Sequence, residues 1–257
     1  ALIPLFVIFL HVIKSGASAI NYDFLTQLPA PAGQPGGGIA NAIIGSITMV
    51  ALASIIAVPF GVLGGTYLSE YKGGKLASTF RFIVDLMTSI PSIIIGLYIY
   101  SVIVVPMKGF SAYAGALALA LLIFPIVVKS TEEILKLLPS NIREAGLALG
   151  IPRWRVIISI ILRGSIPGIT TGVLLAVARV SGETAPLLFT AFGNQFWARS
   201  LNEPTSSLTV QIYNYAISPF QEWHEQAWAG AFILLLTIFI FNLVARWLLL
   251  RNKNEYL

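Results

Sequence analysis

Residues 144–155 read Glu144-Ala145-Gly146-Leu147-Ala148-Leu149-Gly150-Ile151-Pro152-Arg153-Trp154-Arg155, within a charged connection that covers residues 131–164. The run begins as a short helix, reaches a glycine at which the chain can turn, and continues with a proline suited to start a second helix. Charged and apolar residues are interleaved through the connection at roughly helical spacing. We therefore predict a helix-turn-helix here rather than a flexible tether. An ordinary amphipathic helix at the membrane interface is the alternative.

The rest of the chain is strongly apolar. Of its 257 residues, 56% are hydrophobic and only 11% are charged, and the mean hydropathy is +0.83. A soluble domain is about a quarter charged, so this composition does not supply a water-exposed surface. We expect an all-α membrane protein with about six transmembrane helices. The expected spans lie near residues 1–13, 39–69, 82–105, 112–130, 165–192 and 227–250.

Several expected spans contain a feature that bends or shortens a helix. Pro59, Pro91, Pro125 and Pro186 fall inside spans, where a proline kinks a helix and frees a carbonyl group. Residues 1–38 are expected to be a first transmembrane helix cut at its start, followed by an outer loop. A signal peptide is the competing interpretation of that first apolar run.

Basic residues are distributed unevenly over the two sides of this arrangement. When connections are assigned alternately, one side receives Lys72, Lys75, Arg81, Lys129, Lys136, Arg143, Arg153, Arg155, Arg163, Arg246, Arg251 and Lys253. The other side receives Lys14, Lys108 and Arg199, and Arg179 lies within a span. Basic residues collect on the cytoplasmic side of membrane proteins. We therefore expect an inner-membrane protein with connection 131–164 and both chain ends in the cytoplasm.

Composition and motifs exclude several functions. The net charge of +5 is explained by membrane orientation, so nucleic-acid binding is not expected. The sequence has no Gly-x-x-x-x-Gly-Lys-Ser/Thr phosphate loop, so an ATPase site of that kind is not expected in this chain. An aspartyl protease pair is excluded because Asp23 lies in an outer loop, away from Asp85. With no cysteine and with isolated His11 and His224, the chain also lacks a recognisable metal motif.

Two charges stand inside the fifth expected span. Arg179 and Glu183 are four residues apart and would share one face of a helix, where charges need a partner or water. An ion pair between them is one interpretation. The other is a path for an oxyanion, in which Arg179 offers a planar fork of donors, Glu183 orients it, and Ser181 or Thr184 adds a hydroxyl donor.

A second pair with helical spacing occurs near the end of the third expected span. Arg81 precedes Asp85 by four residues. We interpret these two residues as a structural ion pair on one helix.

Connection 131–164 resembles the EAA loop of ABC importer permeases. Matching residues are Glu144, Ala145, Gly150, Ile160 and Leu162, and the departures are Gly146 in place of an alanine and Arg163 in place of a proline, with Pro167 a turn later. In that family the loop is a coupling helix seated in a groove of the ATPase subunit. The resemblance implies that residues 144–155, including Arg153 and Trp154, couple the spans to an ATPase.

A finer resemblance concerns residues 179–190, Arg-Val-Ser-Gly-Glu-Thr-Ala-Pro-Leu-Leu-Phe-Thr, which are similar to a segment of the phosphate-specific transport (Pst) permeases. Residues 67–71, 89–97 and 208–213 are similar to the same family. The resemblance implies a type I permease domain over residues 39–250, with a cytoplasmic tail at 251–257. It also implies that Arg179 and Glu183 are the charged pair implicated in phosphate passage.

The resemblance implies partners as well. They are a PstC-like sister permease, two PstB-like ATPase subunits that use ATP and Mg, and an external PstS-like phosphate-binding protein, with no cofactor bound by this chain. A permease for another oxyanion, molybdate or sulfate, is the first alternative. An ion-coupled secondary transporter is the second, with Glu183 as its one strong titratable candidate.

Overall fold

The computed structural model describes residues 2–34, 36–71 and 73–253. Lys72 of the expected cytoplasmic set and residues 254–257 of the expected tail lie outside the described residues. Across the described ranges the chain is helical, and its β structure is limited to one isolated bridge between Pro29 and Gly37. The expectation of an all-α protein is confirmed.

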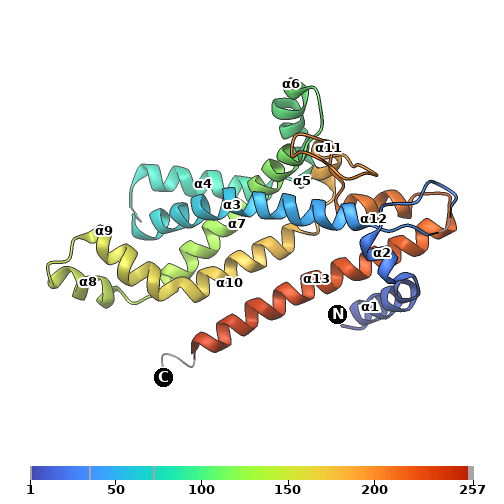
Figure 1. The fold of residues 1–257 in the computed structure, drawn as a ribbon. Helices are drawn as coiled ribbons and strands as arrows, with labels where there is room; N and C mark the ends of the chain where they lie inside the picture. Colours follow the sequence, from blue (N-terminus) through green and yellow to red (C-terminus); the bar gives the residue numbers. More distant parts are fainter. Residues whose placement is uncertain (1, 35, 72, 254–257) are drawn as a thin grey trace. The chain divides into compact units, whose positions relative to one another are not determined.

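Figure 1 shows the order of the helices along the chain. Two π-helical turns interrupt regular helix, at Tyr100–Val104 and Ile157–Leu162. The helices are α1 (Leu2–Gly16), α2 (Tyr22–Thr26), α3 (Ala40–Glu70), α4 (Lys75–Ser89), α5 (Ser92–Ile99), α6 (Val105–Met107), α7 (Ala112–Lys136), α8 (Ser140–Ala148), α9 (Arg153–Val156), α10 (Arg163–Val180), α11 (Ala185–Thr190), α12 (Leu208–Ala216) and α13 (Gln221–Lys253).

Within the described ranges, four helices are long and apolar enough to cross a membrane: Ala40–Glu70, Ala112–Lys136, Arg153–Val180 and Gln221–Val244. A fifth candidate is the pair Lys75–Ser89 and Ser92–Met107, which is bent by 101°. Helix α1 has 15 residues, fewer than a span of about 20 requires. By length and composition, the described helices therefore supply four spans, or five with the bent pair.

The prolines explain the shape of two expected spans. Pro59 and Pro125 lie inside α3 and α7, as predicted. Pro91 precedes α5 at the 101° bend, so the expected span 82–105 is kinked at this proline and has the two arms Lys75–Ser89 and Ser92–Met107. Pro186 occupies the first turn of α11, where the absence of an N–H group costs nothing. The expected span 165–192 consequently ends at Val180.

The described residues form two compact units. Unit 1 comprises Ala1–Ala53, Pro91–Leu119 and Val180–Ile240. Its largest buried side chains include Phe24, Ile39 and Tyr215, which share one apolar cluster with Leu208. A neutral hydrogen bond joins the second turn of α3 to the start of α12, because Ser46 Oγ accepts from the Leu208 N–H at 2.7 Å.

Unit 2 comprises Ser54–Ile90, Ala120–Arg179 and Phe241–Leu257. Here the second half of α3 packs against α4 and α7 through Leu68, Val84 and Val128. Gly65 makes this approach possible, since a Cβ atom there would lie 2.5 Å from the Val128 carbonyl oxygen and 2.6 Å from Thr131 Cβ. Small residues bring helix backbones together in this way within membranes.

Candidate functional site

Residues 140–156 form a helical hairpin in unit 2, made of α8, a turn and α9 (Figure 1). Gly150 turns the chain with φ of +74°, a left-handed conformation that favours glycine. Pro152 then stands at the N-cap of α9. From Arg153 the helix continues through the π-helical turn to Val180. This is the predicted helix-turn-helix, and we refer to residues 140–156 as the hairpin.

The two arms of the hairpin meet at Gly146. A Cβ atom on this buried residue would lie 3.0 Å from Val156 Cγ2 and 3.2 Å from Val156 Cγ1. Glycine in place of the usual alanine thus lets α8 approach α9 more closely. Arg163, the other departure, begins α10 without interrupting the helix.

The hairpin exposes the residues that we expected to couple it to an ATPase. Glu144, Ala145, Gly150 and Arg153 are exposed, as is Trp154, with 59% of its surface accessible. Apolar side chains accompany them, with Leu147 at 47% and Leu149 at 79% exposure. Exposed apolar groups among charged ones are typical of a surface that binds another protein.

Glu70, the last residue of α3, is held by both arms of the hairpin. Its side chain is only 5% exposed, and Oε1 accepts a hydrogen bond from Arg143 Nε at 2.9 Å. Its backbone carbonyl accepts from Arg153 Nη2 at 2.7 Å. The Arg153 guanidinium also lies 4.7 Å above the Tyr71 ring, in a cation–π contact. We call Glu70, Arg143 and Arg153 the Glu70 clamp.

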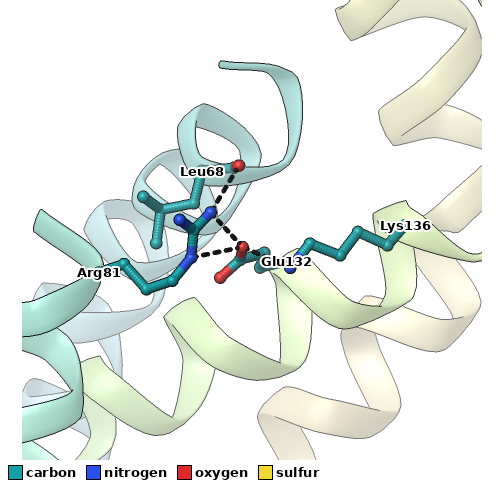
Figure 2. Close-up of polar contacts among 4 residues, drawn as sticks. All are labelled: Leu68, Arg81, Glu132 and Lys136. Carbon is teal, nitrogen blue, oxygen red and sulfur yellow. Dashed lines mark hydrogen bonds and ion pairs between the residues drawn. The ribbon is translucent and has the colours of Figure 1, made fainter. Parts of the chain in front are cut away.

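A second charged cluster lies beside the first, on α3, α4 and α7 (Figure 2). Glu132 has a 7% exposed side chain, and its Oε1 lies 2.7 Å from Arg81 Nη2 and 2.6 Å from Lys136 Nζ. Arg81 Nη2 also donates to the Leu68 carbonyl at 3.3 Å. The carbonyl groups at the end of α3 thus receive cationic donors, which stabilise a helix C-terminus.

This cluster corrects one prediction. Arg81 does not pair with Asp85, because it pairs with Glu132 on α7. Asp85 lies 2.8 Å from Lys129 Nζ instead. Both pairs connect α4 to α7, so tertiary packing overrides the i, i+4 relation within α4.

The charged segment 179–184 is not one helical face. Arg179 is an exposed residue of the last turn of α10, and that helix ends at Val180. Glu183 follows in a turn, where its N–H donates to the Val180 carbonyl at 3.0 Å and its own carbonyl accepts from Thr209 Oγ1 at 2.9 Å. The predicted i, i+4 helical relation between the two charges is therefore wrong.

The other predicted residues of this segment lie on either side of Glu183. Ser181 is half-buried in the turn, and Thr184 is the N-cap residue of α11. Within the described ranges, no cluster of three or more His, Cys, Asp or Glu residues has a spacing suited to a metal ion.

Sequence reasoning did not single out Glu70 or Glu132. Glu132 counted only as one charge of the connection 131–164, and Glu70 only as part of a similar segment. The available signal was a carboxylate at the end of a long apolar run. Such a charge needs a cation nearby, although the sequence does not say which one.

The chain is similar to known transport proteins. The family described as "Binding-protein-dependent transport system inner membrane component" matches residues 57–254. The chain is 50% identical over 236 residues to the phosphate transport system permease protein PstA of Haemophilus influenzae. The aligned region covers 91% of this chain and 83% of that protein. It is 45% identical over 248 residues to the PstA protein of Yersinia pestis, with coverage of 96% and 84%.

A solved structure shares the fold. The MetNI methionine ABC transporter in inward-facing conformations contains a chain that matches with a TM-score of 0.68. The alignment covers 82% of this chain and 94% of that one, at 17% identity. At this identity the likeness concerns the fold alone.

Proposed function

The chain belongs to the binding-protein-dependent transport system inner membrane components, and within them to the PstA permeases, and from this premise we propose that it is the membrane-spanning permease subunit of an ATP-driven phosphate importer. The observation that carries the proposal is the hairpin, which combines exposed apolar residues with the Glu70 clamp on α3.

The proposal includes partners. A separate ATPase, used in two copies, supplies the nucleotide chemistry with ATP and Mg, since the sequence holds no phosphate loop. A sister permease of the PstC kind completes the path, and an external phosphate-binding protein of the PstS kind delivers the anion. The basic hairpin faces the cytoplasm, with both chain ends on the same side.

We propose that Arg179 serves the anion path. It is a cation at the end of an apolar helix and is exposed within this chain, so its guanidinium is accessible to an anion or to a partner subunit. Guanidinium groups bind phosphate oxygens through two parallel hydrogen bonds. Ser181, Glu183 and Thr184 follow Arg179 closely in the chain. Ser181 and Glu183 come directly after α10, and Thr184 is the N-cap residue of α11.

The test reconstitutes the chain with its candidate partners in liposomes and measures uptake of radiolabelled phosphate with and without ATP. We expect ATP-dependent uptake that excess phosphate inhibits and that molybdate and sulfate do not. Inhibition by molybdate or sulfate alone would favour the other oxyanion permeases. Uptake without ATP or partners would favour the secondary transporter.

A variant set then tests the anion path. Arg179→Ala should lower uptake by at least about tenfold, which corresponds to a lost interaction of about 1.4 kcal/mol, and Arg179→Lys should retain part of it. The control is Arg163→Ala, an exposed arginine at the other end of α10. Complex assembly is measured for each variant, and equal uptake by Arg179→Ala would remove this residue from the path.

A further inference from the structure

The Glu70 clamp links the hairpin to α3, a helix that the hairpin does not follow directly along the chain. Along the sequence, the hairpin leads directly into α10, while α3 ends 70 residues earlier than the first hairpin residue, Ser140. Arg143 on α8 and Arg153 on α9 both reach the last residue of α3. Each arm of the hairpin is thereby fixed to α3 by its own hydrogen bond.

Each of the three guanidinium nitrogens of Arg143 donates a hydrogen bond. Besides Glu70, it donates through Nη1 to the Leu138 carbonyl at 3.0 Å and through Nη2 to the Leu135 carbonyl at 2.9 Å. One guanidinium therefore joins the ends of α3 and α7 to α8. Glu70 is a buried carboxylate with a charge-assisted hydrogen bond to Arg143. Moving Arg143 away would leave this buried charge without compensation, so the pair keeps one geometry.

The end of α3 also contacts α4 and α7. Arg81 binds the Leu68 carbonyl and Glu132 (Figure 2). Gly65 allows close contact with the backbone of α7. Displacement of the hairpin is therefore transmitted to a helix end with little freedom to adjust locally. Helix α3 contains Pro59, and its second half lies in unit 2, so this half can carry the displacement away from the hairpin.

We propose that Glu70 is a positioning residue for transport, which makes α3 move together with the hairpin when the ATPase moves the hairpin. The inference rests on the proposed function and adds a second mechanical route beside the covalent one into α10. When the clamp is removed, the hairpin still binds the ATPase and still moves α10, but α3 no longer follows. ATP hydrolysis then continues while transport falls.

The experiment uses the whole reconstituted complex and measures phosphate taken up per ATP hydrolysed. Glu70→Gln keeps the backbone carbonyl and the side-chain shape but removes the charge that binds Arg143. We expect this ratio to fall by at least about fivefold, the lower end of typical coupling between sites, with stimulated ATPase activity retained. The matched control, Glu133→Gln, removes an exposed carboxylate of α7 and should leave the ratio within about twofold of wild type.

A second variant covers the case in which Glu70→Gln fails to assemble. Arg143→Lys keeps a cation opposite Glu70, replaces the guanidinium that also donates to the Leu135 and Leu138 carbonyls, and leaves the exposed residues expected to contact the ATPase unchanged. It should assemble normally and lower the ratio by a smaller factor than Glu70→Gln. An unchanged ratio in every assembled variant of the clamp overturns the inference, as does a parallel loss of uptake and ATPase activity.

The proposed function fails separately. If the wild-type complex takes up no phosphate with ATP, the function is wrong before any clamp variant is measured. If the wild type transports phosphate and the clamp variants transport it with the same ratio, only the positioning role of Glu70 is wrong.

Discussion

Two regions of the chain solve the same packing problem with different chemistry. At the start of α3, in unit 1, Asn41 Nδ2 donates to the Asn194 carbonyl at 2.5 Å and Ser46 binds the Leu208 N–H. At the end of α3, in unit 2, the corresponding bonds come from Arg81, Arg143 and Arg153. Among the described residues, every ion pair lies in unit 2.

Because the contacts differ, the two regions should tolerate different kinds of substitution. Both regions bring backbones together at a glycine, Gly45 in unit 1 and Gly65 in unit 2. Both should therefore fail when volume is added. Only the unit 2 region should respond to the loss of a charge, because its polar contacts are ionic and the unit 1 contacts are neutral.

The largest expected effect comes from added volume. Gly65→Ala places a methyl group 2.5 Å from the Val128 carbonyl, and Gly45→Ala places one against the Ser206 carbonyl and 2.7 Å from Thr205 Cγ2. Because the obstacles include backbone, each change should cost about 3 kcal/mol. The measurement is the thermal midpoint of the purified chain in detergent.

Gly164→Ala is the matched control for that pair. A Cβ atom there would meet nothing within 4 Å, and the residue lies in α10. It should be neutral or should stabilise the helix by up to about 1 kcal/mol. A midpoint for Gly65→Ala or Gly45→Ala equal to that of Gly164→Ala would refute the close contacts at α3.

An intermediate effect is expected from Glu132→Gln. The change leaves Arg81 and Lys136 without their shared carboxylate oxygen. Since both cations are partly exposed, we expect a loss of about 2 kcal/mol, below the range for fully buried pairs. Denaturant unfolding measures it, and Glu133→Gln again serves as the control. Equal stability of the two variants would mean that the cluster in unit 2 contributes nothing.

The smallest effect should come from Thr209→Val in unit 1. This change removes the neutral hydrogen bond from Oγ1 to the Glu183 carbonyl, at 2.9 Å, and the weaker contact of 3.3 Å with Ser207 Oγ, and it keeps the side-chain shape. The expected loss is about 1 kcal/mol, the usual value for such a bond. A loss greater than that of Glu132→Gln would reverse the comparison between the two regions.

The sequence predicted features that depend on local chemistry. The hairpin followed from Gly150 and Pro152, because a turn and a helix start have strong residue preferences. Apolar runs predicted α3, α7 and α13 with small errors at their ends. These are patterns within one segment, and they need no knowledge of the neighbouring segments.

Features that depend on tertiary contacts were predicted poorly. Arg81 has Asp85 at helical spacing, yet it binds Glu132, which lies 51 positions away. The end of α10 at Val180 was also missed. Residues 179–182 do not signal the end of a helix strongly enough to outweigh the apolar run around them. The proposed role of residues 179–184 in the anion path therefore rests mainly on resemblance, whereas the proposed role of Glu70 rests on contacts in the structure.

The central claim, that the hairpin couples the spans to an ATPase on the cytoplasmic side, has one direct test. The chain contains no cysteine, so Leu147→Cys on the exposed face of α8 supplies its single thiol, and Phe196→Cys supplies a control in the expected outer loop. A membrane-impermeant maleimide is applied to inside-out vesicles with and without the ATPase subunit. We expect Leu147→Cys to be labelled without the ATPase and protected with it, and Phe196→Cys to be unlabelled in both. Equal labelling of Leu147→Cys with and without bound ATPase, or its labelling only from the outer side, would contradict the account.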